Sequence, residues 1–215
     1  MAAKSFVVYG LGKFGYSVAV SLAKNGCEVL AIDNNGDIVE DIANDVTLAV
    51  RGNVKDQDIY HSLGIGNMDG AVVAVSGDME ASILATILSK EAGIPYVLAK
   101  AESQTHAEVL KKIGADQVIL PEREMGSRVA RNMVFGKFMD TFELSSTYSM
   151  AELEVPDSWV GKSLRQLDVR CRYGINVIAA REGEQINTNL DPDEPLVQHQ
   201  IILTVGNNED LKKIK

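Results

Sequence analysis

The sequence contains the stretch Val7-Val8-Tyr9-Gly10-Leu11-Gly12-Lys13-Phe14-Gly15, in which an apolar run meets three glycines at G-x-G-x-x-G spacing. Residues 6–9 predict a buried strand, and residues 16–24 have helical periodicity. The first glycine would permit a tight turn, the second would let the backbone approach a pyrophosphate, and the third would let the helix pack against the strand. The phosphates would lie at the positive N-terminus of the helix. The expected nucleotide contacts are Gly10, Leu11, Gly12, Lys13, Phe14 and Gly15, and the alternative is that these glycines serve packing alone.

An acidic residue follows the next predicted strand. Residues 28–32 run into Asp33, where a carboxylate can accept both ribose hydroxyls of an adenine nucleotide. This carboxylate would repel a 2′-phosphate, and the following Asn34 and Asn35 supply no cation to offset it. We therefore expect an adenine nucleotide other than NADP, contacted by Asp33 and Asn34. The alternative role of Asp33 is a helix cap or a turn residue before Gly36.

Four more apolar segments alternate with helical segments along the first two thirds of the chain. They cover residues 47–50, 70–75, 96–99 and 117–120. The run 70–75 does not alternate with polar residues, as expected for a parallel sheet that is covered on both faces. Six strands that alternate with helices predict a Rossmann-like, doubly wound α/β fold.

Three loops of this fold are expected to add contacts to the nucleotide. The loop after the third strand would lie over the adenine and contribute Gly52, Asn53 and Val54, or else be a plain turn. Ser76 and Gly77 follow the fourth strand, at the carboxyl edge where ligands of open α/β sheets bind. Lys100 stands at the end of the fifth strand and is expected to contact a phosphate.

The sequence pattern changes near Asp140, where short alternating strands replace the earlier pattern. We predict a small α+β lobe with strands at 141–144, 150–155, 175–180 and 201–205, a helix at 163–167, and a proline-rich turn at 191–195. The predicted domains are residues 1–139 and 140–215.

A helix from residue 122 to about 138 precedes this boundary, and Gly136-Lys137 breaks its pattern. Its apolar stripe is either core or an interface with a second subunit. The stripe contains Met125, Val129, Met133 and Val134.

Composition excludes several classes of protein. The 215 residues carry a formal net charge of −9, which argues against a general nucleic-acid binder with a basic face. The apolar segments are too short to span a bilayer, and no signal peptide precedes the first strand. We therefore expect a cytoplasmic protein with no membrane insertion of its own. Cys27 and Cys171 are far apart and predict two reduced thiols without a zinc site.

Catalytic residues are scarce outside the nucleotide domain. A dehydrogenase needs a His or Lys acid/base and an Arg for the substrate anion, but the second lobe has one histidine, His199. His61 and His106 fall on predicted surface helices. A nucleotide site without such groups predicts a sensor in which the ligand biases a conformational equilibrium. The alternatives are a small NAD-dependent oxidoreductase and a redox-sensing transcription regulator, although the latter lacks a DNA-binding segment.

The chain resembles the regulatory subunits of Ktr/Trk-type potassium uptake systems, the RCK (or KTN) domain proteins of the TrkA family. The resemblance implies a non-catalytic cytosolic protein that binds ATP, ADP or NAD(H) and gates a separate membrane potassium channel subunit. It also implies dimers that assemble into rings, commonly octamers. The motifs that carry it are Tyr9-Gly-Leu-Gly-Lys-Phe-Gly15, Asp33, Arg51-Gly-Asn-Val54, Lys100-Ala101, Lys112-Ile-Gly-Ala-Asp116, Pro121-Glu-Arg-Glu-Met-Gly126 and Leu167-Asp-Val-Arg-Cys-Arg-Tyr-Gly174.

The same resemblance assigns roles to two charged residues near the phosphates. Glu122 matches a family carboxylate at the dimer interface, where a divalent cation such as Mg²⁺ bridges; alternatively it is a first-turn acid that favours the helix dipole. Lys13 stands where the family often has Arg. Lysine keeps the charge but loses the bidentate fork, so we expect weaker discrimination between triphosphate and diphosphate.

The second lobe resembles RCK C-terminal domains, some of which bind cyclic di-AMP across a two-fold interface. Arg170 matches a phosphate contact, and two symmetric arginines suit a two-fold symmetric ligand; the alternative is a surface ion pair. Arg165 replaces a residue that is often aliphatic in the family, so we expect an altered pocket. Leu164, Ile175 and Pro192 match apolar wall positions.

Overall fold

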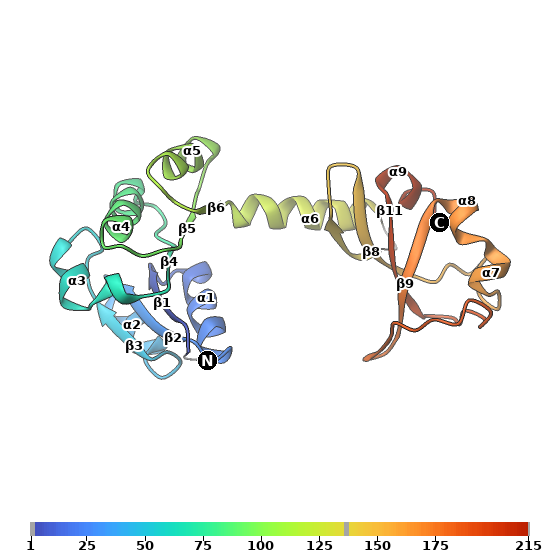
Figure 1. Ribbon diagram of the computed structural model, residues 1–215, viewed down its shortest axis with the longest axis horizontal. Coiled ribbons are helices and arrows are strands. Elements are labelled where there is room, and N and C mark those ends of the chain that lie inside the picture. The colour runs from blue at the N-terminus through green and yellow to red at the C-terminus, as the bar shows by residue number, and fades with distance from the viewer. Residues whose placement is uncertain (1–2, 136–137, 215) are drawn as a thin grey trace. The chain divides into compact units, whose positions relative to one another are not determined.

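The computed structural model describes residues 3–135 and 138–214 (Figure 1). The chain divides into two compact units, Met1–Pro121 and Glu122–Lys215. The predicted boundary between 139 and 140 stays a prediction, and the break predicted at Gly136-Lys137 lies outside the described residues.

The first unit is built around a parallel sheet of six strands, in the order β3-β2-β1-β4-β5-β6. This order confirms the predicted doubly wound fold, because the chain starts in the middle of the sheet and is wound outward in both directions. Its elements are β1 (Ser5–Tyr9), α1 (Lys13–Lys24), β2 (Glu28–Asp33), α2 (Gly36–Ile42), β3 (Leu48–Arg51), α3 (Gln57–Ser62), a 3₁₀ turn (Ile65–Asn67), β4 (Gly70–Val73), α4 (Met79–Glu91), β5 (Val97–Lys100), α5 (Gln104–Lys112) and β6 (Gln117–Ile119).

Alternating side chains of β1 build the two cores of this unit. Val7 and Tyr9 join one cluster with residues of α3, α4 and α5, whereas Val8 joins another with residues of α1 and α2. The sheet is therefore covered by helices on both faces, which explains the unbroken apolar runs in its strands.

One expectation about this unit is wrong. His106 does not lie on the surface, since it is only 2% exposed. Its Nδ1 accepts a hydrogen bond from the backbone N–H of Glu102 at 3.4 Å, so α5 turns this polar side chain inward.

The second unit has an antiparallel sheet in the order β10-β9-β11-β8-β7, which confirms the predicted α+β lobe. Trp159, 2% exposed, is the largest side chain of its core. The sequence did not predict β10, α8 or α9. The elements are α6 (Pro121–Phe135), β7 (Phe138–Glu143), β8 (Tyr148–Glu154), α7 (Leu164–Leu167), α8 (Val169–Tyr173), β9 (Ile175–Glu182), β10 (Gln185–Asn187), β11 (Ile201–Asn207) and α9 (Asn208–Leu211).

The apolar stripe of α6 is exposed in the single chain. Met125, Val129 and Met133 are 50%, 49% and 79% exposed, and the side chain of Val134 lies outside the described residues. The side chains of Met125, Val129 and Met133 are outside the cores of the described residues, and the interface with a second subunit stays a prediction.

Candidate functional site

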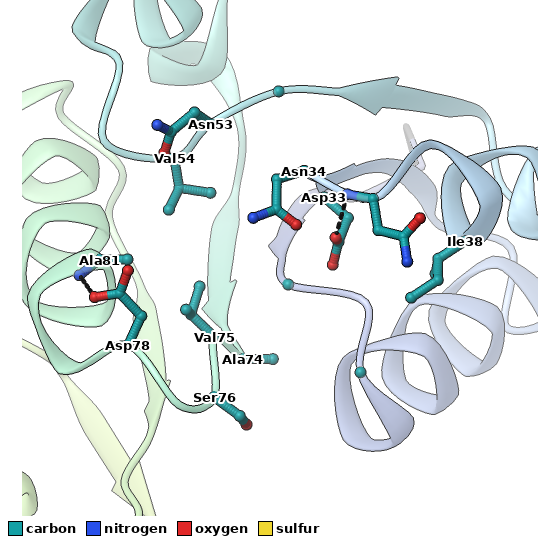
Figure 2. Close-up of a pocket in the computed structure, with 14 residues that line it drawn as sticks. Asp33, Asn34, Ile38, Asn53, Val54, Ala74, Val75, Ser76, Asp78 and Ala81 are labelled. Atoms are coloured by element: carbon teal, nitrogen blue, oxygen red, sulfur yellow. Dashed lines mark hydrogen bonds between the residues drawn. The ribbon is translucent and has the colours of Figure 1, made fainter.

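A cavity of about 350 Å³ opens at the carboxyl edge of the parallel sheet, within the roughly 300–1,000 Å³ of small-molecule sites. Loops that follow β1, β2, β3 and β4 line it (Figure 2). The predicted residues on its wall are Gly10, Gly12, Asp33, Asn34, Gly52, Asn53, Val54 and Ser76.

Asp33 is held with its carboxylate toward residues 10–15, which we call the glycine loop. Its Oδ2 accepts the backbone N–H of Leu11 at 2.6 Å, and its Oδ1 accepts the backbone N–H of Asn35 at 2.8 Å. A carboxylate has about four acceptor positions, so each oxygen retains one for a further donor. Asp33 can therefore take two hydroxyl groups without giving up the bonds that orient it.

The three glycines of the loop have three different environments. Gly10 has φ +84°, and a Cβ there would lie 2.9 Å from the backbone of Val75. A Cβ on Gly15 would lie 1.9 Å from the carbonyl oxygen of Gly10. A Cβ on Gly12 would meet nothing within 4 Å. The first and third glycines are thus required by the fold, whereas the second leaves space on the cavity wall.

A buried tyrosine anchors the loop after β3 from the core side. The hydroxyl of the buried Tyr60 donates to the carbonyl oxygen of Val54 at 3.0 Å, and the N–H of Gly52 donates to the carbonyl oxygen of Asp33 at 2.8 Å. A Cβ on Gly52 would lie 2.5 Å from Cδ1 of Ile59. These contacts order the segment on the cavity wall, and its contact with a nucleotide stays a prediction.

Two of the predicted contacts, Lys100 and Gly77, are not on the cavity wall. The buried Lys100 donates from Nζ to Oγ of Ser76 at 3.2 Å, and the N–H of Gly77 donates to Oε1 of Glu102 at 2.8 Å. They support the loop after β4 but are not among the residues that line the cavity.

The remaining residues of the glycine loop also lie off the wall. Leu11 is buried in the core, with Phe14 packed against the same cluster. Lys13 is exposed as the first residue of α1, next to the cavity-lining Gly12. The side chains of Leu11 and Phe14 therefore serve packing, and a contact of Lys13 with a ligand stays a prediction.

Sequence reasoning missed part of the wall and one nearby cation. Ala74 and Val75 were assigned to a strand that ends earlier, at Val73. The guanidinium of Arg51 donates to the carbonyl oxygen of Asn34 at 3.2 Å. A cation therefore lies close to the residue that follows Asp33, and the exclusion of NADP stays a prediction. The wall residues outside the predicted contacts are Asn35, Ile38, Ala74, Val75, Asp78 and Ala81.

Glu122 lies in the first turn of α6, in the second unit. Among the described residues, no group of three or more His, Cys, Asp and Glu side chains could hold a metal ion. The role of Glu122 beside phosphates or a divalent cation stays a prediction.

A second cavity, of about 470 Å³, lies between α7, α8, β9 and the proline-rich turn. All the residues proposed for this lobe line it: Leu164, Arg165, Arg170, Ile175 and Pro192, together with Asp168, Val169, Val177 and Leu190. The Arg165 guanidinium forms a bidentate pair with Asp193, with Nε–Oδ1 2.6 Å and Nη2–Oδ2 3.1 Å. This pair ties α7 to the turn at the rim of the cavity.

Comparison with known proteins gives the family. Residues 6–121 match the TrkA-N domain and residues 150–215 match the TrkA-C domain. The chain belongs to the TrkA family of Ktr/Trk potassium uptake regulators. Ktr system potassium uptake protein C of Bacillus subtilis (strain 168) is 36% identical over 212 residues, covering 99% of this chain and 96% of that protein. Ktr system potassium uptake protein A of Vibrio alginolyticus is 37% identical, covering 97% of this chain and 94% of that protein.

Solved structures share the fold. A GsuK RCK domain has a TM-score of 0.67 and 16% identity, covering 98% of this chain and 46% of that chain. A GsuK channel bound to NAD has a TM-score of 0.65 at 16% identity, covering 98% of this chain and 38% of that chain. This TrkA-family chain thus spans less than half of those longer chains. None of its described helices combines the length and apolar character needed to cross a bilayer.

Proposed function

We propose that this protein is a non-catalytic, cytoplasmic regulatory subunit that binds an adenine nucleotide, ATP, ADP or NAD(H), in its first unit. The bound nucleotide changes the shape of a ring of dimers, an octamer by family resemblance, and thereby controls a membrane potassium transport subunit of Ktr/Trk type. The observation that carries the nucleotide proposal is the Asp33 carboxylate, oriented on the cavity wall beside Gly12 with two acceptor positions available.

The arrangement around α1 supports a phosphate beside this ribose position. The first N–H groups of a helix lack intrahelical partners and attract anions. Gly12, the N-cap of α1, supplies no side-chain cap, and the first turn carries no acidic residue. By resemblance, Lys13 adds a cation there, and Glu122 would share a Mg²⁺ ion with the phosphates.

The second cavity supports a further ligand, cyclic di-AMP. Arg170 and Arg165 provide positive charge for phosphates, while Leu164, Ile175 and Pro192 provide apolar surface for a base. A two-fold dimer would present two such cavities to a ligand of the same symmetry. The Arg165 guanidinium is already paired with Asp193, which supports Arg170 as the main phosphate contact.

An NAD-dependent oxidoreductase is the second candidate function, because the fold and Asp33 would suit its cofactor equally well. It would require an acid/base beside the nicotinamide. The described residues of the cavity wall include Asp33 and Asp78 but no His, Lys or Tyr. We therefore favour regulation, and absence of NADH turnover with a panel of carbonyl substrates would be the expected result.

Calorimetric titration of the full chain with ATP, ADP, NADH and cyclic di-AMP tests the two-site proposal. Asp33→Asn should weaken the adenine nucleotides by about tenfold or more, since a charged acceptor is lost, and leave cyclic di-AMP unchanged. Arg170→Ala should weaken the binding of cyclic di-AMP and leave the adenine nucleotides unchanged. The matched controls are the exposed Asp41→Asn and Arg172→Ala. Wild-type protein that binds none of these ligands would refute the proposal.

The regulatory part is tested by potassium flux into proteoliposomes that contain a Ktr-type membrane subunit. Addition of this chain should make the flux depend on ATP or ADP. A flux that is the same with and without the chain would exclude that pairing.

A further inference from the structure

The ammonium group of Lys55 joins two loops of the nucleotide cavity. Its Nζ lies 3.0 Å from Oδ2 of Asp78 and 2.6 Å from Oε2 of Glu80. The Lys55 side chain is 30% exposed, and those of Asp78 and Glu80 are 46% and 73% exposed. Water therefore screens the contact with Asp78 less than the contact with Glu80. Lys55 belongs to the segment between β3 and α3, whereas its partners belong to the start of α4.

These two segments follow strands that are not neighbours. In the order β3-β2-β1-β4, two other strands separate the carboxyl ends of β3 and β4. Both segments nevertheless line the cavity, the first through Asn53 and Val54, the second through Asp78 and Ala81. Figure 2 shows these four residues on one side of the view, with Asp33 and Ile38 on the other. The Lys55 bridge therefore connects two loops of the cavity whose preceding strands, β3 and β4, do not pair with each other.

Asp78 has a second contact that fixes its position. Its Oδ1 accepts the N–H of Ala81 at 3.0 Å and caps α4. This backbone bond, followed by the Lys55 ammonium, holds the pKa of Asp78 below its ordinary value. The carboxylate is thus charged on a wall that already contains Asp33, and Lys55 offsets one of these two negative charges where an anionic ligand would enter.

We propose that Lys55 is a positioning residue that clasps the β3–α3 loop to the start of α4 and slows the release of the bound nucleotide. This inference rests on the proposed function of the first unit. Tyr60 holds the same loop from the core side through Val54, so the clasp fixes the one end that faces solvent. Loss of the ammonium frees both loops and leaves Asp78 without its cation.

The test measures release of a fluorescent ADP analogue from the full chain by stopped flow. Lys55→Met should raise the dissociation rate constant about three- to fivefold, the range that one partly exposed ion-pair bridge supplies. Lys55→Arg retains the charge and should release the nucleotide at close to the wild-type rate. Lys111→Met, an exposed lysine of α5, is the matched control and should have no effect.

Salt separates the clasp from a general loss of stability. High salt screens the bridge, so the difference between wild type and Lys55→Met should shrink as salt is raised. Glu80→Gln removes one partner and should give a smaller increase, and the double variant should release the nucleotide no faster than Lys55→Met. Equal dissociation rates for Lys55→Met and Lys111→Met would overturn the clasp while nucleotide binding stands. Failure of the wild type to bind the analogue would overturn the proposed function and the clasp together.

Discussion

Alanine at Gly15 should lower the stability of the chain, whereas alanine at Gly12 should leave stability nearly unchanged and weaken nucleotide binding. Both residues belong to the G-x-G-x-x-G stretch, Gly12 as the N-cap of α1 and Gly15 within its first turn, and each substitution adds one methyl group. At Gly15 the new Cβ would lie 1.9 Å from the carbonyl oxygen of Gly10 and 3.0 Å from Cβ of Ala74. At Gly12 it would meet nothing within 4 Å, and the backbone has an ordinary φ of −62°.

The magnitude for Gly15→Ala follows from the movement it requires. A carbon–oxygen contact must open from 1.9 Å to about 3.3 Å, so the start of α1 has to move by about 1.4 Å. Overpacking of this kind costs about 1–3 kcal/mol, occasionally more, and the better helix propensity of Ala returns up to ~1 kcal/mol. We expect a net loss of about 2 kcal/mol, or roughly 4–8 °C in Tm for a chain of this size.

Gly12→Ala should instead act on the ligand. Its stability should remain within about 0.5 kcal/mol of wild type, while the methyl group occupies the surface that a pyrophosphate would approach. We expect at least about a tenfold loss in ADP affinity, since ~1.4 kcal/mol corresponds to a factor of ten. Thermal unfolding followed by circular dichroism measures the first quantity, and calorimetric titration with ADP measures the second.

Two results would refute this reasoning. If Gly12→Ala lowered Tm as much as Gly15→Ala, the space beside Gly12 would not be open. If Gly12→Ala bound ADP with wild-type affinity, the nucleotide would not approach the loop at this residue.

Two further variants test the packing of each unit. Burial lowers the pKa of His106 below its ordinary 6.5, so the unfolded chain binds more protons and stability should fall as the pH drops below about 6.5. Tm should fall less with pH in His106→Gln, and an equal fall in that variant would contradict this. His61→Gln is the exposed control. Trp159→Ala should lower the free energy of unfolding by about 3–5 kcal/mol in urea denaturation, whereas the half-exposed Tyr148→Ala should change it by less than about 0.5 kcal/mol.

The fold could be predicted because its signals are local. The strand, the glycines, the helix and Asp33 follow one another within the first 33 residues, and each has a spacing that few other structures require. The wall after β4 was missed because residues 70–75 are uniformly apolar, although pairing with β5 ends at Val73. Composition alone does not tell where a strand loses its partner.

Long-range polar contacts were the other part that the sequence did not reveal. Lys55 and Glu80 are 25 residues apart, and no periodicity relates them. The same holds for Arg165 and Asp193, 28 residues apart, whose pairing depends on how the proline-rich turn folds back on α7. His106 was misplaced because the helix around it is mostly polar, and only tertiary packing decides which polar side chain is turned inward.

Because the two units have separate hydrophobic cores, recombination between related genes can exchange one unit without disturbing the other. Among the described residues, each cluster draws its members from one unit: two clusters from the first and one, around Trp159, from the second. A crossover between related genes within the codons for α6 would therefore join the first lobe of one parent to the second lobe of the other without opening either core. Selection can then exchange one lobe while the other lobe is inherited intact.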